Sequence, residues 1–91
     1  MTTAEIIAKI NECICKVNTR WRVDDFAKFD TERTTLEYDL CMDSLGIMEL
    51  QFEIEILFVI EFTDEEWCFI RTLKHLYEIT EKKVIKKDEN R

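Results

Sequence analysis

The sequence predicts an all-α fold: a four-helix bundle of three long helices and one short one, in a single domain over residues 1–91. The chain has no proline and only one glycine, so helix formers dominate and tight turns are few. Apolar residues recur three and four positions apart in several segments, which is the period of an amphipathic helix. Residues that cap helix N-termini precede these segments.

The first predicted helix covers residues 3–17, where aliphatic side chains form one stripe and Thr2 or Thr3 can serve as the N-cap. The helical period is lost from residue 18 to residue 38, so we expect a long loop there. Spanning the length of the bundle between two neighbouring helices would explain so long a loop in a small domain. Its aromatic side chains are expected to form a short helical turn or to anchor the loop to the core.

The second long helix is predicted to begin at Ser44 and to end near Phe58. Residues 49–56 also alternate between polar and apolar, which a β-strand would share. A serine cap and the helical surroundings favour a helix. A short third helix is predicted after Thr63, with an acidic first turn, and a last helix after Thr72.

The net charge of −7 is unevenly distributed. Residues 37–66 contain ten carboxylates and no Lys, Arg or His, whereas residues 81–91 are basic and are expected to form a frayed, solvated tail. The acidic segment would repel nucleic acid and attract a partner with a basic surface. We therefore expect no nucleic-acid binding.

The cysteines and the single histidine suggest no metal site and no catalysis. Cys13, Cys15, Cys41 and Cys68 form no C-x-x-C pair, and His75 stands apart from them in sequence. We expect free, mostly buried thiols in a reducing cytoplasm, with Cys41 as a packing residue rather than a reactive thiol. The chain shows no leader pattern and no apolar run of membrane-span length, and the absence of an acid–base constellation argues against an enzyme.

The most specific pattern lies in residues 39–45, which read Asp-Leu-Cys-Met-Asp-Ser-Leu at the start of a predicted helix. Met-Glu-Leu follows at 48–50, and Asp-Glu-Glu follows the helix at 64–66. This series, in register over residues 36–79, resembles the signature of acyl carrier proteins. The resemblance implies an acyl-carrier-protein-like four-helix bundle with a long loop between its first two helices.

The residues themselves make Ser44 a plausible modification site. A serine at a helix start has its hydroxyl outside the backbone hydrogen-bond ladder, and the helix N-terminus favours an attached phosphodiester. We expect Leu40 and Leu45 to anchor the flanks in the core and to hold Ser44 outward. The alternative is that Ser44 serves only as an N-cap.

The resemblance implies that a phosphopantetheinyl transferase recognises the Asp43–Ser44 pair, with Leu45 beside it, and attaches 4'-phosphopantetheine from coenzyme A to Ser44. The arm would carry acyl groups as thioesters to synthases, transferases or ligases of fatty-acid, polyketide or related lipid or secondary-metabolite biosynthesis. The chain would then be a carrier rather than an enzyme.

The resemblance also implies docking by carboxylates. Glu49, Glu53 and Glu55 would meet basic patches on the partner enzymes, with Glu61 and Asp64 at the far end of the helix. Such contacts would be salt-sensitive and modest in affinity.

The sequence departs from the family pattern at several positions. Gly46 and the pair Ile56–Leu57 stand where acids are usual, Cys41 where glycine is usual, and Thr63 where proline is frequent. These differences favour a specialised pathway. Ile56 and Leu57 would either meet different partners or be buried against the long loop or a second protomer.

Two other functions stay open at this stage: a peptidyl or D-alanyl carrier, and a non-covalent acidic helical interaction module. The aromatic side chains are assigned to the core, which in a carrier could open between helices to shelter an acyl chain. They are Trp21, Phe26, Phe29, Phe52, Phe58, Phe62, Trp67 and Phe69.

Overall fold

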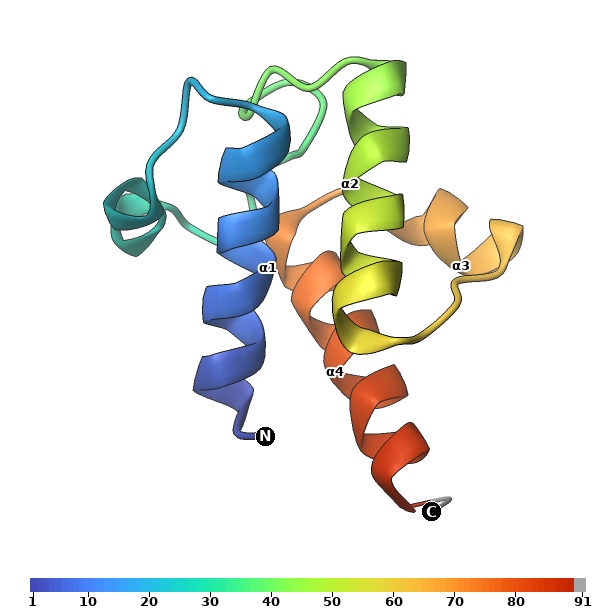
Figure 1. The fold of residues 1–91 in the computed structure, drawn as a ribbon. Helices are drawn as coiled ribbons and strands as arrows, with labels where there is room; N and C mark the ends of the chain where they lie inside the picture. Colours follow the sequence, from blue (N-terminus) through green and yellow to red (C-terminus); the bar gives the residue numbers. More distant parts are fainter. Residues whose placement is uncertain (90–91) are drawn as a thin grey trace.

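The computed structural model describes residues 1–89, and its regular secondary structure is all helical, as predicted (Figure 1). No β-strand occurs in that range; an isolated bridge joins Thr35 to Thr72. The elements are α1 (Thr3–Val17), a 3₁₀ helix η1 (Val23–Lys28), α2 (Ser44–Phe58), α3 (Asp64–Phe69) and α4 (Leu73–Glu89). The three long helices and the short α3 agree with the predicted set, and the alternating segment 49–56 is helical.

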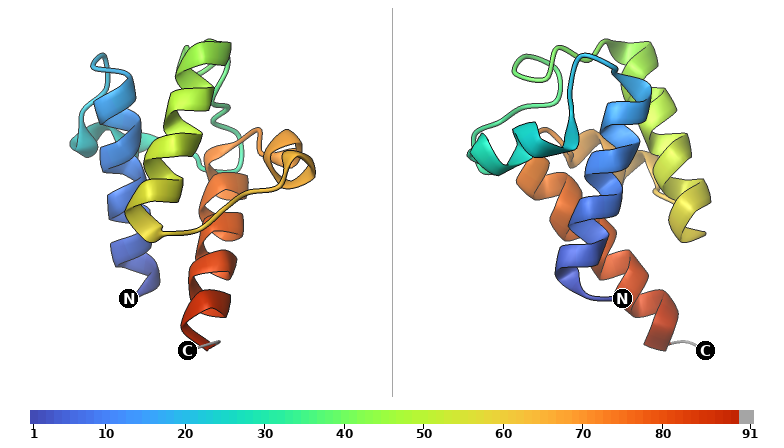
Figure 2. Two further views of the ribbon diagram at one scale, coloured as in Figure 1. Left: turned by 45° about the vertical axis from the view of Figure 1, so that its right-hand side comes forward. Right: turned by 60° about the vertical axis from the view of Figure 1, so that its left-hand side comes forward.

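The long helices form the body of the fold. α1 and α2 lie side by side and run in opposite directions, and α4 packs against α1 (Figures 1 and 2). The C-terminal end of α1 and the N-terminal end of α2 therefore lie at the same end of the molecule. The short α3 stands to one side of α2, between the end of that helix and the start of α4 (Figure 1).

Local capping explains where the helices begin. The Thr2 hydroxyl accepts from Glu5 N at 3.2 Å, and Glu5 returns a capping-box contact to the Thr2 backbone. Thr63 forms the same box with Glu66, and the Thr72 hydroxyl accepts from His75 N at 3.3 Å. Each such cap contributes about 1 kcal/mol. The three expected threonine caps are thus in place, with Thr2 rather than Thr3 at the first helix.

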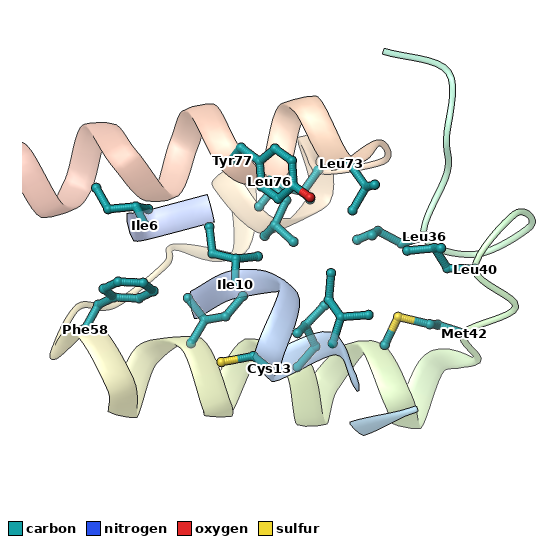
Figure 3. Close-up of a cluster of buried hydrophobic side chains, with 14 of the residues drawn as sticks. Ile6, Ile10, Cys13, Leu36, Leu40, Met42, Phe58, Leu73, Leu76 and Tyr77 are labelled. Atoms are coloured by element: carbon teal, nitrogen blue, oxygen red, sulfur yellow. The ribbon is translucent and has the colours of Figure 1, made fainter. Parts of the chain in front are cut away.

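The core lies where α1, α2, α4 and the long loop meet (Figure 3). Asn11 lies at its edge and accepts a hydrogen bond from the Tyr77 hydroxyl. Burial raises the pKa of Tyr77 to about 12, so this donor keeps its proton. The side chains with almost no exposed surface are Ile6, Ile10, Ile14, Leu36, Leu40, Leu50, Ile54, Leu73, Leu76 and Thr80.

The sequence suggested that the long loop spans the length of the bundle. The structure shows a different path. It leaves the end of α1, passes through η1 beside that helix and returns to the same end, where α2 starts (Figures 1 and 2). The antiparallel order of α1 and α2 makes a crossing unnecessary. Phe26 is buried, Trp21 and Phe29 pack edge to face with ring centroids 5.4 Å apart, and the loop is anchored as expected.

The basic segment is not a frayed tail within the described residues. Residues 81–89 continue α4, and Val84 is buried. Lys83 Nζ lies 2.8 Å from a Glu66 carboxylate oxygen, and Lys87 Nζ donates to the Phe58 carbonyl at 3.1 Å. The two lysines therefore bind acceptors on α3 and at the end of α2. These contacts join residues far apart in sequence, so the sequence pattern did not predict them. Residues 90–91 lie outside the described part.

Two expectations about burial are wrong. All four cysteines are free, but Cys13 alone is buried and Cys15 partly buried, whereas Cys41 and Cys68 are exposed. Cys41 is therefore not a packing residue. Among the aromatic side chains assigned to the core, Phe52 and Phe69 are exposed.

Candidate functional site

Ser44 is the first residue of α2 and is exposed to solvent at the end of the molecule where the long loop returns (Figure 1). The predicted start of the helix is therefore confirmed. The residue before it, Asp43, is exposed as well. The two side chains implied by the sequence signature thus lie together on an accessible surface.

Asp43, and not Ser44, caps this helix. The Asp43 backbone is extended, and its carboxylate Oδ1 accepts from Gly46 N at 2.7 Å. The Asp43 carbonyl accepts the first helical bond, from Ile47 N at 2.9 Å. A carboxylate is the stronger acceptor and also interacts with the positive end of the helix dipole. The expected Ser44 cap is therefore wrong, and the serine hydroxyl has no capping task.

The hydrogen bond from Gly46 N to the Asp43 carboxylate also affects whether a free anion can bind at the start of α2. A helix N-terminus attracts anions through its unpaired N–H groups and its dipole. Here the Asp43 carboxylate already occupies that position. The site therefore offers little attraction to a second, freely diffusing anion, and a phosphate group at Ser44 would have to be held by a covalent bond.

The chain leading to Ser44 is held firmly. Leu40 is fully buried, as expected, and its carbonyl accepts from the Trp21 indole N–H at 2.9 Å and from the Asn18 side-chain amide at 3.1 Å. Met42 is buried too. Leu45, expected to be the second anchor, instead points to solvent. Of the two leucines expected to flank Ser44 as anchors, Leu40 alone is buried.

Cys41 lies between these anchors with a φ of 56°, in the left-handed region that favours glycine. Its thiol lies 3.5 Å from the Tyr38 carbonyl. A glycine would adopt this backbone conformation at less cost than a cysteine. The exposed thiol lies three residues before Ser44.

The three carboxylates expected to dock on partners differ in whether they already have a binding partner within the fold. Glu49 is exposed. Glu53 is paired with Lys16 of α1 at 3.0 Å. Glu55 accepts from the Phe62 backbone N–H at 2.8 Å and so holds the connection between α2 and α3. Glu53 and Glu55 therefore have partners within the fold, and Glu49 is the one that projects freely beside the site.

Sequence reasoning missed an apolar stripe on the outer face of α2, formed by Leu45, Met48, Phe52, Ile56 and Val59. Ile56 and Leu57 are both exposed, so the alternative that they are buried against the long loop is wrong. The spacing of the stripe's apolar residues in the sequence already indicates that they share one side of the helix. Positions 45, 48, 52 and 56 form one helical series, with Val59 directly after the helix, and this series is separate from the buried residues Leu50, Ile54 and Phe58.

A cavity of about 330 Å³ opens between the long loop, α2 and α3. Ile47, one turn after Ser44 in α2, forms part of its wall. The other lining residues are Thr35, Leu36, Glu37, Tyr38, Cys68, Ile70 and Arg71. Its wall combines apolar side chains with a few polar ones, as small-molecule sites do.

The part of the chain that the structure describes holds no cluster of three or more His, Cys, Asp or Glu suited to a metal ion. Nor does any helix in it have the length and apolar character needed to cross a bilayer. His75 Nδ1 accepts from Arg71 N at 3.4 Å, so the ring contributes to the start of α4. Comparison with family models, curated proteins and solved structures found no match to this chain.

Proposed function

We propose that this chain is an acyl carrier protein in which Ser44 bears 4'-phosphopantetheine. The observation that supports this most directly is that different residues at the start of α2 provide the helix cap and the free hydroxyl. Asp43 performs the capping, and the exposed Ser44 hydroxyl is left free for an enzyme. Ser44 is also the only serine of the chain.

The loading reaction would be a phosphoryl-type transfer on the serine oxygen. The Ser44 Oγ attacks the pantetheine-side phosphorus of the coenzyme A pyrophosphate, the P–O bond to the nucleotide breaks, and 3',5'-ADP leaves. The hydroxyl proton passes to a base of the phosphopantetheinyl transferase. The new phosphodiester would lie at the N-terminus of α2, and the terminal thiol of the arm would hold the acyl group as a thioester.

The bundle is of the kind that the proposal needs. Three long helices, one short helix and a long connection before α2 are what an acyl-carrier-type bundle would have. The cavity next to Ile47 lies one helical turn from the attachment point and within the volume range of small-molecule pockets. It is the place where we expect a cargo to be sheltered.

The intact mass of the purified chain tests the proposal. The chain is incubated with coenzyme A and a broad-specificity phosphopantetheinyl transferase, and Ser44→Ala is treated in parallel. A gain of one phosphopantetheine on the wild type alone is expected. Thr63→Ala serves as the matched control, since it removes a hydroxyl from another helix start and should load normally.

Absence of any gain, on a chain whose circular dichroism shows it to be folded and with a working control carrier, would refute the proposal. It would leave a non-covalent interaction module as the better reading. A gain that persists in Ser44→Ala would place the modification elsewhere and would equally contradict the assignment of Ser44.

A further inference from the structure

Arg71 is an isolated cation in an acidic part of the chain. Between Arg33 and Lys74 the sequence holds no other Lys, Arg or His, whereas residues 37–66 contain ten carboxylates. A guanidinium pairs well with a carboxylate because its planar fork of N–H groups matches the two oxygens. Within residues 1–89, however, Arg71 forms no ion pair. Its charge is therefore available to a ligand.

The backbone of Arg71 is held in place although its side chain is unpaired. Its carbonyl accepts from Leu36 N at 3.0 Å, and its N–H donates to His75 Nδ1 at 3.4 Å. An isolated bridge joins the next residue, Thr72, to Thr35 of the long loop. The guanidinium therefore extends from a fixed point where the long loop meets the start of α4.

Arg71 lines the cavity of about 330 Å³ between the long loop, α2 and α3. Glu37 is the other charged residue of the lining, and Leu36, Ile47 and Ile70 are its aliphatic residues. A water-sized group occupies about 30 Å³, so the cavity has room for about ten non-hydrogen atoms. This composition suits a short apolar chain that carries a charged group at its end.

The two charged residues of the lining would select opposite ligand ends. Arg71 would bind a carboxylate, and Glu37 would bind an ammonium group. Glu37 is one of ten carboxylates in an acidic, largely solvated segment, so its presence at the cavity needs no special reason. Arg71 is the single base in that part of the sequence, and it has no partner of its own. The balance favours a carboxylate.

We propose that the cargo of this carrier is a short acyl chain that ends in a carboxylate, and that Arg71 binds this end in the cavity. A half-thioester of a dicarboxylic acid of adipate length has about ten non-hydrogen atoms, which matches the space available. Its thioester end would lie towards Ile47, one helical turn from Ser44. The inference rests on the proposed carrier function and adds the class of cargo to it.

Adipyl and hexanoyl groups test the proposal, because they have the same chain length and differ in the terminal carboxylate. Each is loaded from its coenzyme A thioester by a broad-specificity phosphopantetheinyl transferase, and the intact mass verifies the loading. The rate of thioester cleavage by hydroxylamine is then measured in the wild type, Arg71→Gln and Glu37→Gln. Arg33→Gln is the matched control, since Arg33 lies in the long loop but does not line the cavity.

A chain end bound to Arg71 holds the thioester against the protein, so the adipyl group should be cleaved about 5-fold more slowly than the hexanoyl group. Arg33→Gln should keep this ratio, and Arg71→Gln should lower it to less than about 2-fold. Glu37→Gln should raise it, because a charge that repels the carboxylate is removed. Salt should lower the ratio in the wild type, because the cavity is open to solvent.

A second measurement uses unloaded protein and separates this inference from the carrier function. Monomethyl adipate and methyl hexanoate are titrated into Ser44→Ala, and amide chemical shifts are recorded. Monomethyl adipate should shift the signals of Ile47, Cys68 and Arg71. Methyl hexanoate should bind at least about 5-fold more weakly, as should monomethyl adipate when Arg71→Gln is combined with Ser44→Ala.

Equal cleavage of the two thioesters in the wild type would overturn the inference. Equal ratios in Arg71→Gln and Arg33→Gln, or a ratio lost in Glu37→Gln instead, would do so too. Failure of loading together with Arg71-dependent binding of monomethyl adipate would refute the carrier function and leave the carboxylate site in place. Successful loading without any effect of Arg71→Gln would leave the carrier function and refute the cargo class.

Discussion

Replacing Asp43 by alanine should destabilise the fold, whereas replacing Ser44 by alanine should not. The Asp43 carboxylate accepts from Gly46 N at 2.7 Å, and no other side chain caps α2. Loss of an N-cap lowers the free energy of unfolding by about 1 kcal/mol. Loss of the negative charge at the helix start adds about 0.5 kcal/mol. We therefore expect about 1.5 kcal/mol for Asp43→Ala and less than about 0.5 kcal/mol for Ser44→Ala.

Urea unfolding followed by circular dichroism at 222 nm measures both values, since a change of this size moves the midpoint without altering the slope. Asp43→Asn is the matched variant. Asparagine keeps the capping oxygen and removes the charge, so about 0.5 kcal/mol or less should be lost. The same three proteins can be offered to the phosphopantetheinyl transferase, which should reject Ser44→Ala.

A loss in Ser44→Ala as large as that in Asp43→Ala would refute this reasoning, because the serine would then share the capping. Equal stability of Asp43→Ala and the wild type would do the same. Either outcome would remove the main support for the carrier proposal, since the Ser44 hydroxyl would no longer be distinguished by its freedom from structural duty.

Three further predictions concern the rest of the fold. Val59 follows α2 with a φ of 54°, so Val59→Gly should raise the free energy of unfolding in urea by about 1 kcal/mol. The Lys83 ammonium lowers the pKa of Glu66, so the stability from this pair is present above the normal carboxyl pKa and is lost as pH falls through the lowered value. Unfolding from about pH 6 to about pH 3 should thus depend less on pH in Glu66→Gln; equal slopes would contradict the pairing. Burial raises the pKa of the Cys13 thiol to about 11, so peptide mapping after iodoacetamide at about pH 8 should show Cys13 alkylated far more slowly than the exposed Cys41.

The helices could be predicted because their determinants are local. Thr2, Thr63 and Thr72 mark three helix starts through contacts with residues three positions away, and the apolar period marks the bodies. The start of α2 was placed correctly, but the cap was placed one residue late. Asp43 and Ser44 are both good cap residues, and the choice depends on backbone angles that composition does not reveal.

The errors arise where tertiary contacts decide. α2 is apolar on two faces, and periodicity cannot tell which face meets the core. Leu45 and Phe52 were assigned inward, yet α1 packs against α2, and it is Leu50 and Ile54 that are buried. The basic segment 81–89 looked like a solvated end because its acceptors, Glu66 and the Phe58 carbonyl, come from distant parts of the chain.

The apolar stripe and the candidate attachment site meet at the start of α2. The apolar stripe begins at Leu45, directly after Ser44, and continues to Val59 at the other end of the helix. A groove that covers the stripe would therefore end beside the serine, which is where an arm attached to Ser44 would emerge. Exposure of Leu45, which contradicts its expected role as a core anchor, makes sense in this arrangement. It allows one partner surface to hold the helix and face the attachment point at the same time.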